Sequence, residues 1–176
     1  MAELYDITQT VEKVILIGVS TGDSDMMKES LDELEELADT AGAVTVGKVI
    51  QNLPQIQQGT YIGTGKIAEI CNLIAETGAT GVICDDELSP AQLKNLEEGL
   101  GTKVMDRTLL ILDIFAARAS TSEGKIQVEL AQLKYRLARL VGLRSSLSRL
   151  GGGIGTRGPG EKNRPAQQRT GRSKKT

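Results

Sequence analysis

The chain of 176 residues contains no histidine and no tryptophan, and aromatic residues make up only 2% of it. Without histidine, it lacks the side chain that most often serves as general base or metal ligand near neutral pH. Its few aromatic rings offer almost no surface on which nucleic-acid bases could stack. These absences argue against a serine–histidine hydrolase, a histidine-ligated metal site and a single-strand stacking platform.

Cysteine is also scarce, and long apolar runs are missing. Cys71 and Cys84 stand in apolar contexts without metal-ligand spacing, so we expect two buried, reduced thiols. No apolar run approaches the length of a membrane span, and the first residues lack the basic and apolar regions of a secretory signal. We therefore expect a cytoplasmic protein with an aliphatic core, no membrane span and no metal site.

The formal net charge of −2 hides an uneven distribution along the chain. Residues 1–143 hold 12 basic and 22 acidic side chains, a net charge of −10. From Arg144 onward there are nine Lys or Arg and a single acid, Glu161, a net charge of +8. An acidic body with a basic end predicts a polyanionic partner that is met at one end only.

The first 105 residues alternate between short, β-branched-rich apolar runs and amphipathic segments. This alternation predicts an α/β fold, a small parallel sheet with flanking helices. We expect strands at residues 14–19, 43–50, 80–84 and 102–105. We expect helices at residues 27–41, 63–76 and 89–98, where Ser89 and Pro90 have the form of a helix start.

After Asp106 the pattern is helical only, with one helix predicted at residues 109–119 and a second from Glu123 to Leu150. Ser120-Thr-Ser-Glu123 has the form of a capping box. The second helix would be roughly 42 Å long at 1.5 Å per residue. Its first part can pack on the α/β domain, whereas its far end needs a partner helix. A coiled-coil-like apolar seam runs along it through Ile126, Leu130, Leu133, Leu137, Leu140 and Leu147.

A glycine-rich stretch, Leu150–Glu161, follows this helix and holds six glycines, one proline and Arg157. Such a composition is typical of a flexible linker. Exposed backbone N–H groups, with Arg144, Arg149 and Arg157 nearby, also suit a loop that lies against phosphates. Both interpretations stay open on composition alone. The chain beyond Glu161 is basic and has no large apolar residue, so we expect a disordered tail.

Two other motifs are weak. Gly63-Thr-Gly-Lys66 resembles the end of a phosphate-binding loop, but Ile67 stands where Ser or Thr should hold Mg²⁺. A helix start is the better interpretation, with a weak anion site as an alternative. Asp85-Asp-Glu87 follows a predicted strand, where α/β sheets bind ligands, yet acids at the start of a helix are more common. A small-molecule or nucleotide site there remains a rival hypothesis.

Several longer motifs resemble the N-terminal region of HflX-type ribosome-associated GTPases, in the family's order and over most of residues 11–161. The matching segments are Tyr61–Glu69 (YIGTGKIAE), Asp85–Glu97 (DDELSPAQLKNLE), Asp106–Ala119 (DRTLLILDIFAARA), Glu123–Leu133 (EGKIQVELAQL) and Leu147–Glu161 (LSRLGGGIGTRGPGE). The resemblance implies an α/β N-terminal domain, a long helical hairpin and a C-terminal GTP-binding domain. It also implies binding to the large ribosomal subunit and splitting of stalled or idle ribosomes.

In this family the glycine-rich segment lies at the turn of the hairpin and reaches ribosomal RNA near the peptidyl-transferase centre. Carried over to this chain, the resemblance implies a set of residues that face ribosomal RNA: Arg149, Gly151, Gly152, Gly153, Gly155, Arg157, Gly158 and Gly160. Arg144 joins this set as a nearby arginine suited to phosphate. No catalytic and no metal-binding residue is implied within the chain. GTP and Mg²⁺ belong to the full-length family, and we expect neither as a cofactor here.

The sequence departs from the family after Glu161. No GxxxxGK[ST] or NKxD motif follows, and Lys162–Thr176 shows no resemblance to the family's returning helix. We expect a chain that stops before the GTP-binding domain, through a frameshift or a trimmed gene product, and that hydrolyses no GTP alone. The expected parts are an α/β domain (1–105), a first hairpin arm (106–150), a glycine-rich loop (151–161) and a basic tail (162–176). A coiled-coil interaction fragment is a further alternative.

Overall fold

Strands and helices alternate along the chain in the computed structural model, which describes residues 11–150 and the side chains of residues 11–140. The elements are β1 (Lys13–Ser20), α1 (Ser24–Thr40), β2 (Val44–Asn52), α2 (Thr64–Thr77), β3 (Gly81–Cys84), α3 (Pro90–Leu100), β4 (Lys103–Asp106), α4 (Arg107–Arg118) and α5 (Ser122–Leu150). This order confirms the α/β fold and the long final helix that the sequence predicts. The glycine-rich stretch and the basic tail lie outside the described residues.

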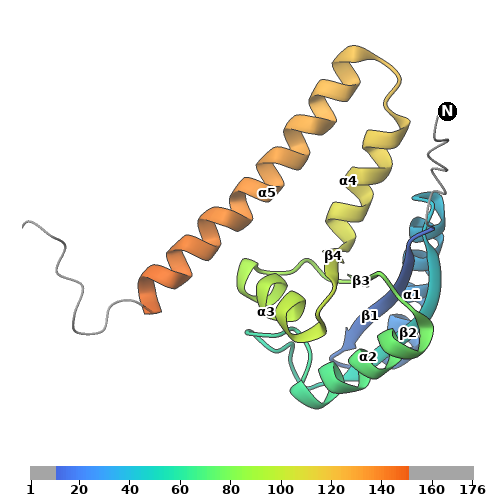
Figure 1. The fold of residues 1–176 in the computed structure, drawn as a ribbon, viewed down its shortest axis with the longest axis vertical. Helices are drawn as coiled ribbons and strands as arrows, with labels where there is room; N and C mark the ends of the chain where they lie inside the picture. Colours follow the sequence, from blue (N-terminus) through green and yellow to red (C-terminus); the bar gives the residue numbers. More distant parts are fainter. Residues whose placement is uncertain (1–10, 151–176) are drawn as a thin grey trace, which may run out of the picture.

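The four strands form one parallel sheet in the order β2-β1-β3-β4. The central strand β1 is buried at every position after Lys13, because helices cover both faces of the sheet. Ile15 and Ile17 pack into one core with α2 and α3, whereas Val14 and Leu16 pack into the other with α1 and α4. The result is a three-layer domain whose α1 and α4 share a face of the sheet (Figure 1).

Local sequence signals explain most helix boundaries. Asp23 caps α1 by accepting a hydrogen bond from the N–H of Asp25 at 2.8 Å. Ser89 and Gln92 form a reciprocal capping box at the start of α3, with Pro90 in its first turn, as the sequence predicts. Helix α3 runs to Leu100, two residues beyond the predicted end, and stops where Gly101 takes a left-handed φ of 65°.

One predicted cap is wrong by a residue. The start of α5 is capped by Thr121, whose Oγ1 accepts from the N–H of Gly124 at 3.0 Å, and not by Ser120. With Thr121 as the cap, the third helical position is occupied by Gly124, so Glu123 is not placed to complete a capping box. The helix still begins within one residue of the prediction.

The two last helices run in opposite directions, α4 away from the sheet and α5 back from its far end (Figure 1). Helix α4 begins directly at the end of β4, and α5 turns back beside it and passes α3, so that its C-terminal end lies away from the sheet (Figure 1). Within residues 11–150, no helix is long and apolar enough to cross a membrane. The fold therefore consists of an α/β body and a helical arm, α5, that projects from it.

Candidate functional site

The residues predicted to face ribosomal RNA lie at and beyond the far end of α5. Arg144 and Arg149 belong to α5 by their backbone, and their side chains are outside the described part of the structure. The remaining predicted residues also fall outside the described residues, namely Gly151, Gly152, Gly153, Gly155, Arg157, Gly158 and Gly160. The structure describes α5, the helical arm that precedes this segment.

The apolar seam of α5 faces solvent along its whole described length. Its side chains are 48–66% exposed, namely Ile126, Leu130, Leu133, Leu137 and Leu140. The first part of the helix does pack against α4 and α3, in line with the expectation, but it does so through a different face.

A different, more polar face of α5 does the packing. It contains the half-buried residues of the helix, Gly124, Val128, Ala131, Gln132, Tyr135 and Arg139, spaced three or four apart. Gln132 donates a hydrogen bond to Asp113 of α4 at 2.8 Å. Tyr135 and Arg139 reach the end of the sheet. Helix α5 is thus held by hydrogen bonds, an ion pair and the packing of the half-buried Val128 and Ala131, and its leucines stay exposed.

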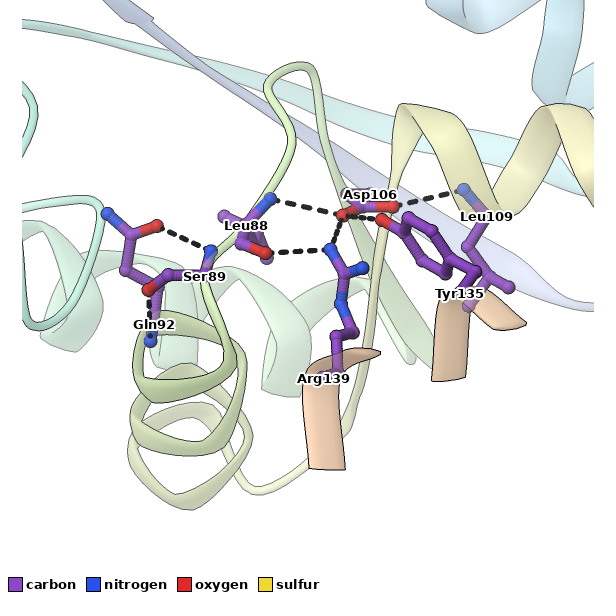
Figure 2. Close-up of polar contacts among 7 residues, drawn as sticks. All are labelled: Leu88, Ser89, Gln92, Asp106, Leu109, Tyr135 and Arg139. Atoms are coloured by element: carbon purple, nitrogen blue, oxygen red, sulfur yellow. Dashed lines mark hydrogen bonds and ion pairs between the residues drawn. The ribbon is translucent and has the colours of Figure 1, made fainter. Parts of the chain in front are cut away.

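Asp106 is the centre of this attachment (Figure 2). It ends β4 and caps α4, and only 2% of it is exposed. Its Oδ1 accepts from the N–H of Leu109 at 3.0 Å, and its Oδ2 accepts from the N–H of Leu88 at 3.1 Å. The hydroxyl of Tyr135 and the guanidinium of Arg139 also donate to Oδ2. A buried carboxylate requires such pairing, since an uncompensated charge is costly away from water.

Arg139 connects α5 to the end of β4 and to the loop before α3. Its Nη2 donates to the carbonyl of Leu88 at 2.7 Å and forms an ion pair with Asp106. Its guanidinium also stacks on the ring of Tyr135, 3.8 Å from the ring centre. Burial, and then the hydrogen bond to Asp106, raise the pKa of Tyr135 above its ordinary value. The tyrosine therefore remains a protonated donor at neutral pH.

The acids after β3 do not converge on a common point. Asp85 accepts from the hydroxyl of Ser30 at 2.7 Å and forms an ion pair with Arg107 at 3.2 Å. Asp86 accepts from the hydroxyl of Tyr61 at 2.6 Å, while Glu87 is exposed. Among residues 11–140, no group of three acids, cysteines or histidines is placed to hold a metal ion. The first two acids serve to join the strand ends to neighbouring elements.

An open cavity of about 410 Å³ lies outside the ends of β1 and β3, where crossovers leave the sheet in opposite directions. Within the described part of the chain, the hydroxyl of Ser20 in its wall is buried and has no hydrogen-bond partner. Other wall residues are Thr21, Asp23, Met26, Met27, Ser30, Ile56 and Asp86. Of the predicted acidic segment, Asp86 lines this cavity and Asp85 does not. The two carboxylates in the wall disfavour an anionic ligand.

The segment Gly63–Lys66 is the start of a helix, as the better interpretation predicts. Gly63 caps α2, and its N–H donates to the side chain of Gln51 at 2.9 Å. Lys66 forms an ion pair with Glu69 at 2.8 Å. The N–H of Gly63 therefore already has an acceptor, so fewer N–H groups remain at this helix start to bind an anion.

The sequence pattern did not single out Asp106, Tyr135 or Arg139. A signal for Asp106 existed, because an acid between a strand and a helix occupies a cap position. Tyr135 and Arg139 lie four residues apart and so share a helix face. The stronger leucine periodicity drew attention to the opposite face. Buried ion pairs need partners from distant segments, and no local pattern specifies those partners.

Comparisons with known proteins identify the two parts of the chain. Residues 28–116 match the family model described as GTP-binding GTPase N-terminal. Residues 118–176 match the model described as GTP-binding GTPase Middle Region. The second match extends to the end of the chain, which corrects our expectation that Lys162–Thr176 falls outside the family.

Individual relatives support the same assignment to GTP-binding GTPases. The chain is 71% identical over 162 residues to the GTPase HflX of Lacrimispora saccharolytica, a match that covers 92% of this chain and 38% of that protein. It is 44% identical over 159 residues to the GTPase HflX of Escherichia coli, covering 90% of this chain and 37% of the relative. A solved GTP-binding protein from the archaeon Sulfolobus solfataricus, in complex with GDP, shares the fold. Its TM-score is 0.57 at 30% identity, covering 78% of this chain and 40% of that one.

The chain thus spans about 38% of the length of these curated relatives. Both family models match consecutive stretches, and their boundary lies between residues 116 and 118, at the end of α4. The N-terminal model therefore covers the body from within α1 to α4 without β1, and the middle-region match begins just before α5. On these matches the chain belongs to the HflX family of GTPases.

Proposed function

We propose that this chain is the part of an HflX-type GTPase that binds the large ribosomal subunit, through ribosomal RNA contacted by Arg144, Arg149 and the segment Gly151–Gly160. In the full-length family this binding would serve to split stalled or idle ribosomes in the cytoplasm. GTP hydrolysis, with GTP and Mg²⁺, would belong to a separate domain. The partner is ribosomal RNA in its subunit, and neither DNA nor a membrane is expected.

The observation that carries this proposal is the projecting arm. Helix α5 leaves the acidic body at a buried anchor, and its far end points away from the sheet (Figure 1). Positive charge gathers from Arg144 onward, at the end that projects. Arginine forks and glycine N–H groups both match phosphate oxygens. A rigid arm with this end is suited to enter a crevice lined by phosphates.

The test is a binding assay with purified large ribosomal subunits. The combined change Arg149→Ala and Arg157→Ala should weaken co-sedimentation, since two phosphate contacts are lost. A matched control is Arg118→Ala with Lys125→Ala, which removes two exposed charges near the opposite end of α5. Equal binding by both double variants would contradict the proposal.

A second function, binding of a small molecule in the cavity beside β1 and β3, is favoured by one observation. The hydroxyl of Ser20 is a buried donor without a partner among the described residues. Because Asp23 and Asp86 in the wall disfavour ATP and GTP, the probe is an uncharged nucleoside such as adenosine or guanosine. Saturable binding that is altered by Asp86→Asn would support this site. Asp85→Asn is a less direct probe, because Asp85 is engaged by Ser30 and Arg107.

A third candidate, a coiled-coil interaction fragment, is favoured by the exposed seam from Ile126 to Leu140. Five apolar side chains in heptad-like spacing on one face could pair with another helix. Sedimentation at several concentrations distinguishes this candidate. A stable dimer lost with Leu133→Glu would support it, and a monomer that still binds large subunits would favour the first proposal.

A further inference from the structure

The direction of α5 depends on a small number of contacts. Beside α4, the described hydrogen bond from α5 is that of Gln132 to Asp113. Toward the body, the described polar contacts of α5 come from Tyr135 and Arg139. Two of these three hydrogen bonds are accepted by the carboxylate of Asp106, and the third is accepted by the carbonyl of Leu88. The apolar seam, which would hold an ordinary surface helix, is turned to solvent.

Asp106 receives donors from three places in the chain. Leu109 belongs to α4, Leu88 to the loop before α3, and Tyr135 with Arg139 to α5. Both carboxylate oxygens are occupied, and the residue is almost fully buried. If α5 swings away, the carboxylate loses both side-chain donors and its positive partner. Such a loss strongly destabilises a buried acid, so the geometry favours one orientation of the arm.

Arg139 limits the rotation of α5 against the α/β body as well as its separation from the body. Its planar guanidinium contacts Asp106, the carbonyl of Leu88 and the face of Tyr135 (Figure 2). Both hydrogen bonds come from the same nitrogen, Nη2, so the two acceptors on the body fix the position of that atom. Lysine could keep the ion pair, but it would lose the planar stacking on Tyr135 that orients the guanidinium.

The arm extends well beyond this anchor. Eleven residues separate Arg139 from Leu150, which is about 16 Å at 1.5 Å per residue, so a rotation of about 10° at the anchor displaces the end by roughly 3 Å. Hydrogen bonds to phosphates tolerate less error than this. The orientation at Asp106 therefore determines where the basic end of the arm is presented.

We propose that Asp106 is a positioning residue that fixes the direction in which α5 leaves the α/β body. Tyr135 and Arg139 are its partners on the arm, and Leu88 joins the end of the sheet to the same contact. Only the consequence for RNA binding rests on the proposed function. The orientation of the arm can be measured on the protein alone.

The experiment places spin labels at Glu76→Cys in α2 and Ser146→Cys in α5, in a Cys71→Ser, Cys84→Ala background, and measures the distance between them. The parent should give one narrow distribution. Asp106→Asn keeps the shape of the side chain but removes its charge. Because Ser146 lies about 10 Å along the helix from Arg139, a rotation of about 10° should shift or broaden the distribution by about 2 Å or more. Ile70→Val, on the buried face of α2, is the control that lowers stability without touching the anchor.

A narrow, unshifted distribution in Asp106→Asn would overturn the proposal, and so would equal broadening in Ile70→Val. Should Asp106→Asn fail to fold, Arg139→Lys and Tyr135→Phe decide instead, because both lie on the arm. Broadening in both supports the positioning role, whereas the parent distribution in both refutes it.

Binding to purified large subunits separates this inference from the proposed function. If both hold, Asp106→Asn weakens co-sedimentation by a larger factor than Ile70→Val. A broadened distance distribution with unchanged binding would leave the positioning role standing and refute the arm as the ribosome-binding element.

Discussion

Burial controls the chemistry of single residues in this chain. Burial raises the pKa of the Cys84 thiol, and the nearby carboxylates of Asp106, Asp86 and Asp85 raise it further. Burial is also the main cause of the raised pKa of Tyr61, whose hydroxyl donates to Asp86. Tyr61 adopts a left-handed φ of 67°, a strained conformation for a tyrosine, which its buried side chain holds in place.

The two cysteines should differ in reactivity. Cys71 is half-buried, whereas Cys84 is fully buried with its thiol kept protonated. We predict that a thiol reagent modifies Cys71 in the native protein and reaches Cys84 only on unfolding. Mass spectrometry after timed labelling checks this, with Cys71→Ser as the control. Rapid modification of Cys84 in native Cys71→Ser protein would contradict the described packing.

Stability should fall at alkaline pH, and Tyr135 should contribute to the fall. Its pKa is raised in the folded state, so the protonated form is favoured there. The resulting stability is present below the ordinary tyrosine pKa of about 10 and is lost as pH rises toward the folded-state value. Tyr135→Phe should cost about 1–3 kcal/mol at neutral pH through the lost hydrogen bond to Asp106.

Urea unfolding from pH 8 to about pH 11 measures both effects. Because Tyr135→Phe removes one titrating group, the decline in the free energy of unfolding should be shallower than in the parent. A parallel decline would show that Tyr135 does not titrate with a raised pKa.

At the scale of elements, helix caps make testable contributions. Ser89 accepts from the N–H of Gln92 at 3.2 Å and begins α3, which borders the anchor of the arm. Ser89→Ala should lower the free energy of unfolding by about 1 kcal/mol. Ser122→Ala is the matched control, because Thr121 provides the cap at the start of α5. Equal losses in the two variants would argue against the capping box.

The sequence predicts the number, type and order of these elements well. Parallel strands covered on both faces produce continuous apolar runs, and caps such as Ser89 mark where helices begin. The orientation of α5 could not be predicted in the same way. Its leucine seam has the stronger periodicity, yet the face that packs carries Gln132, Tyr135 and Arg139. This polar attachment depends on partners that lie 19 to 51 residues away in the sequence.

The exposed seam should cause self-association at high concentration. Contiguous exposed apolar side chains are typical of interaction surfaces, and Leu133 lies at the middle of this one. Leu133→Glu should reduce any concentration-dependent association in sedimentation. Lys134→Glu places the same glutamate at the adjacent exposed position, with a larger change in net charge, and should still have a smaller effect. If both variants behave like the parent, the seam does not drive self-association in solution.

At the scale of the whole molecule, the charge distribution and the projecting arm both favour RNA contact at the end of α5. The α/β body is acidic, and the arm projects from it toward the basic part of the sequence. Repulsion between the acidic body and RNA would disfavour contact anywhere but at the arm's end. The candidate RNA-facing residues came from the family resemblance, since no local pattern distinguishes a linker from a phosphate-binding loop. Those residues stay a prediction.

The most direct test of the central claim is the salt dependence of binding to large ribosomal subunits. With three arginines on phosphates, the association constant should fall by about 40-fold between roughly 50 and 200 mM monovalent salt. The variant Arg149→Ala with Arg157→Ala should show both weaker binding and a shallower slope. Binding by the parent chain that is absent, or independent of salt, would contradict the account of the arm as a ribosomal RNA probe.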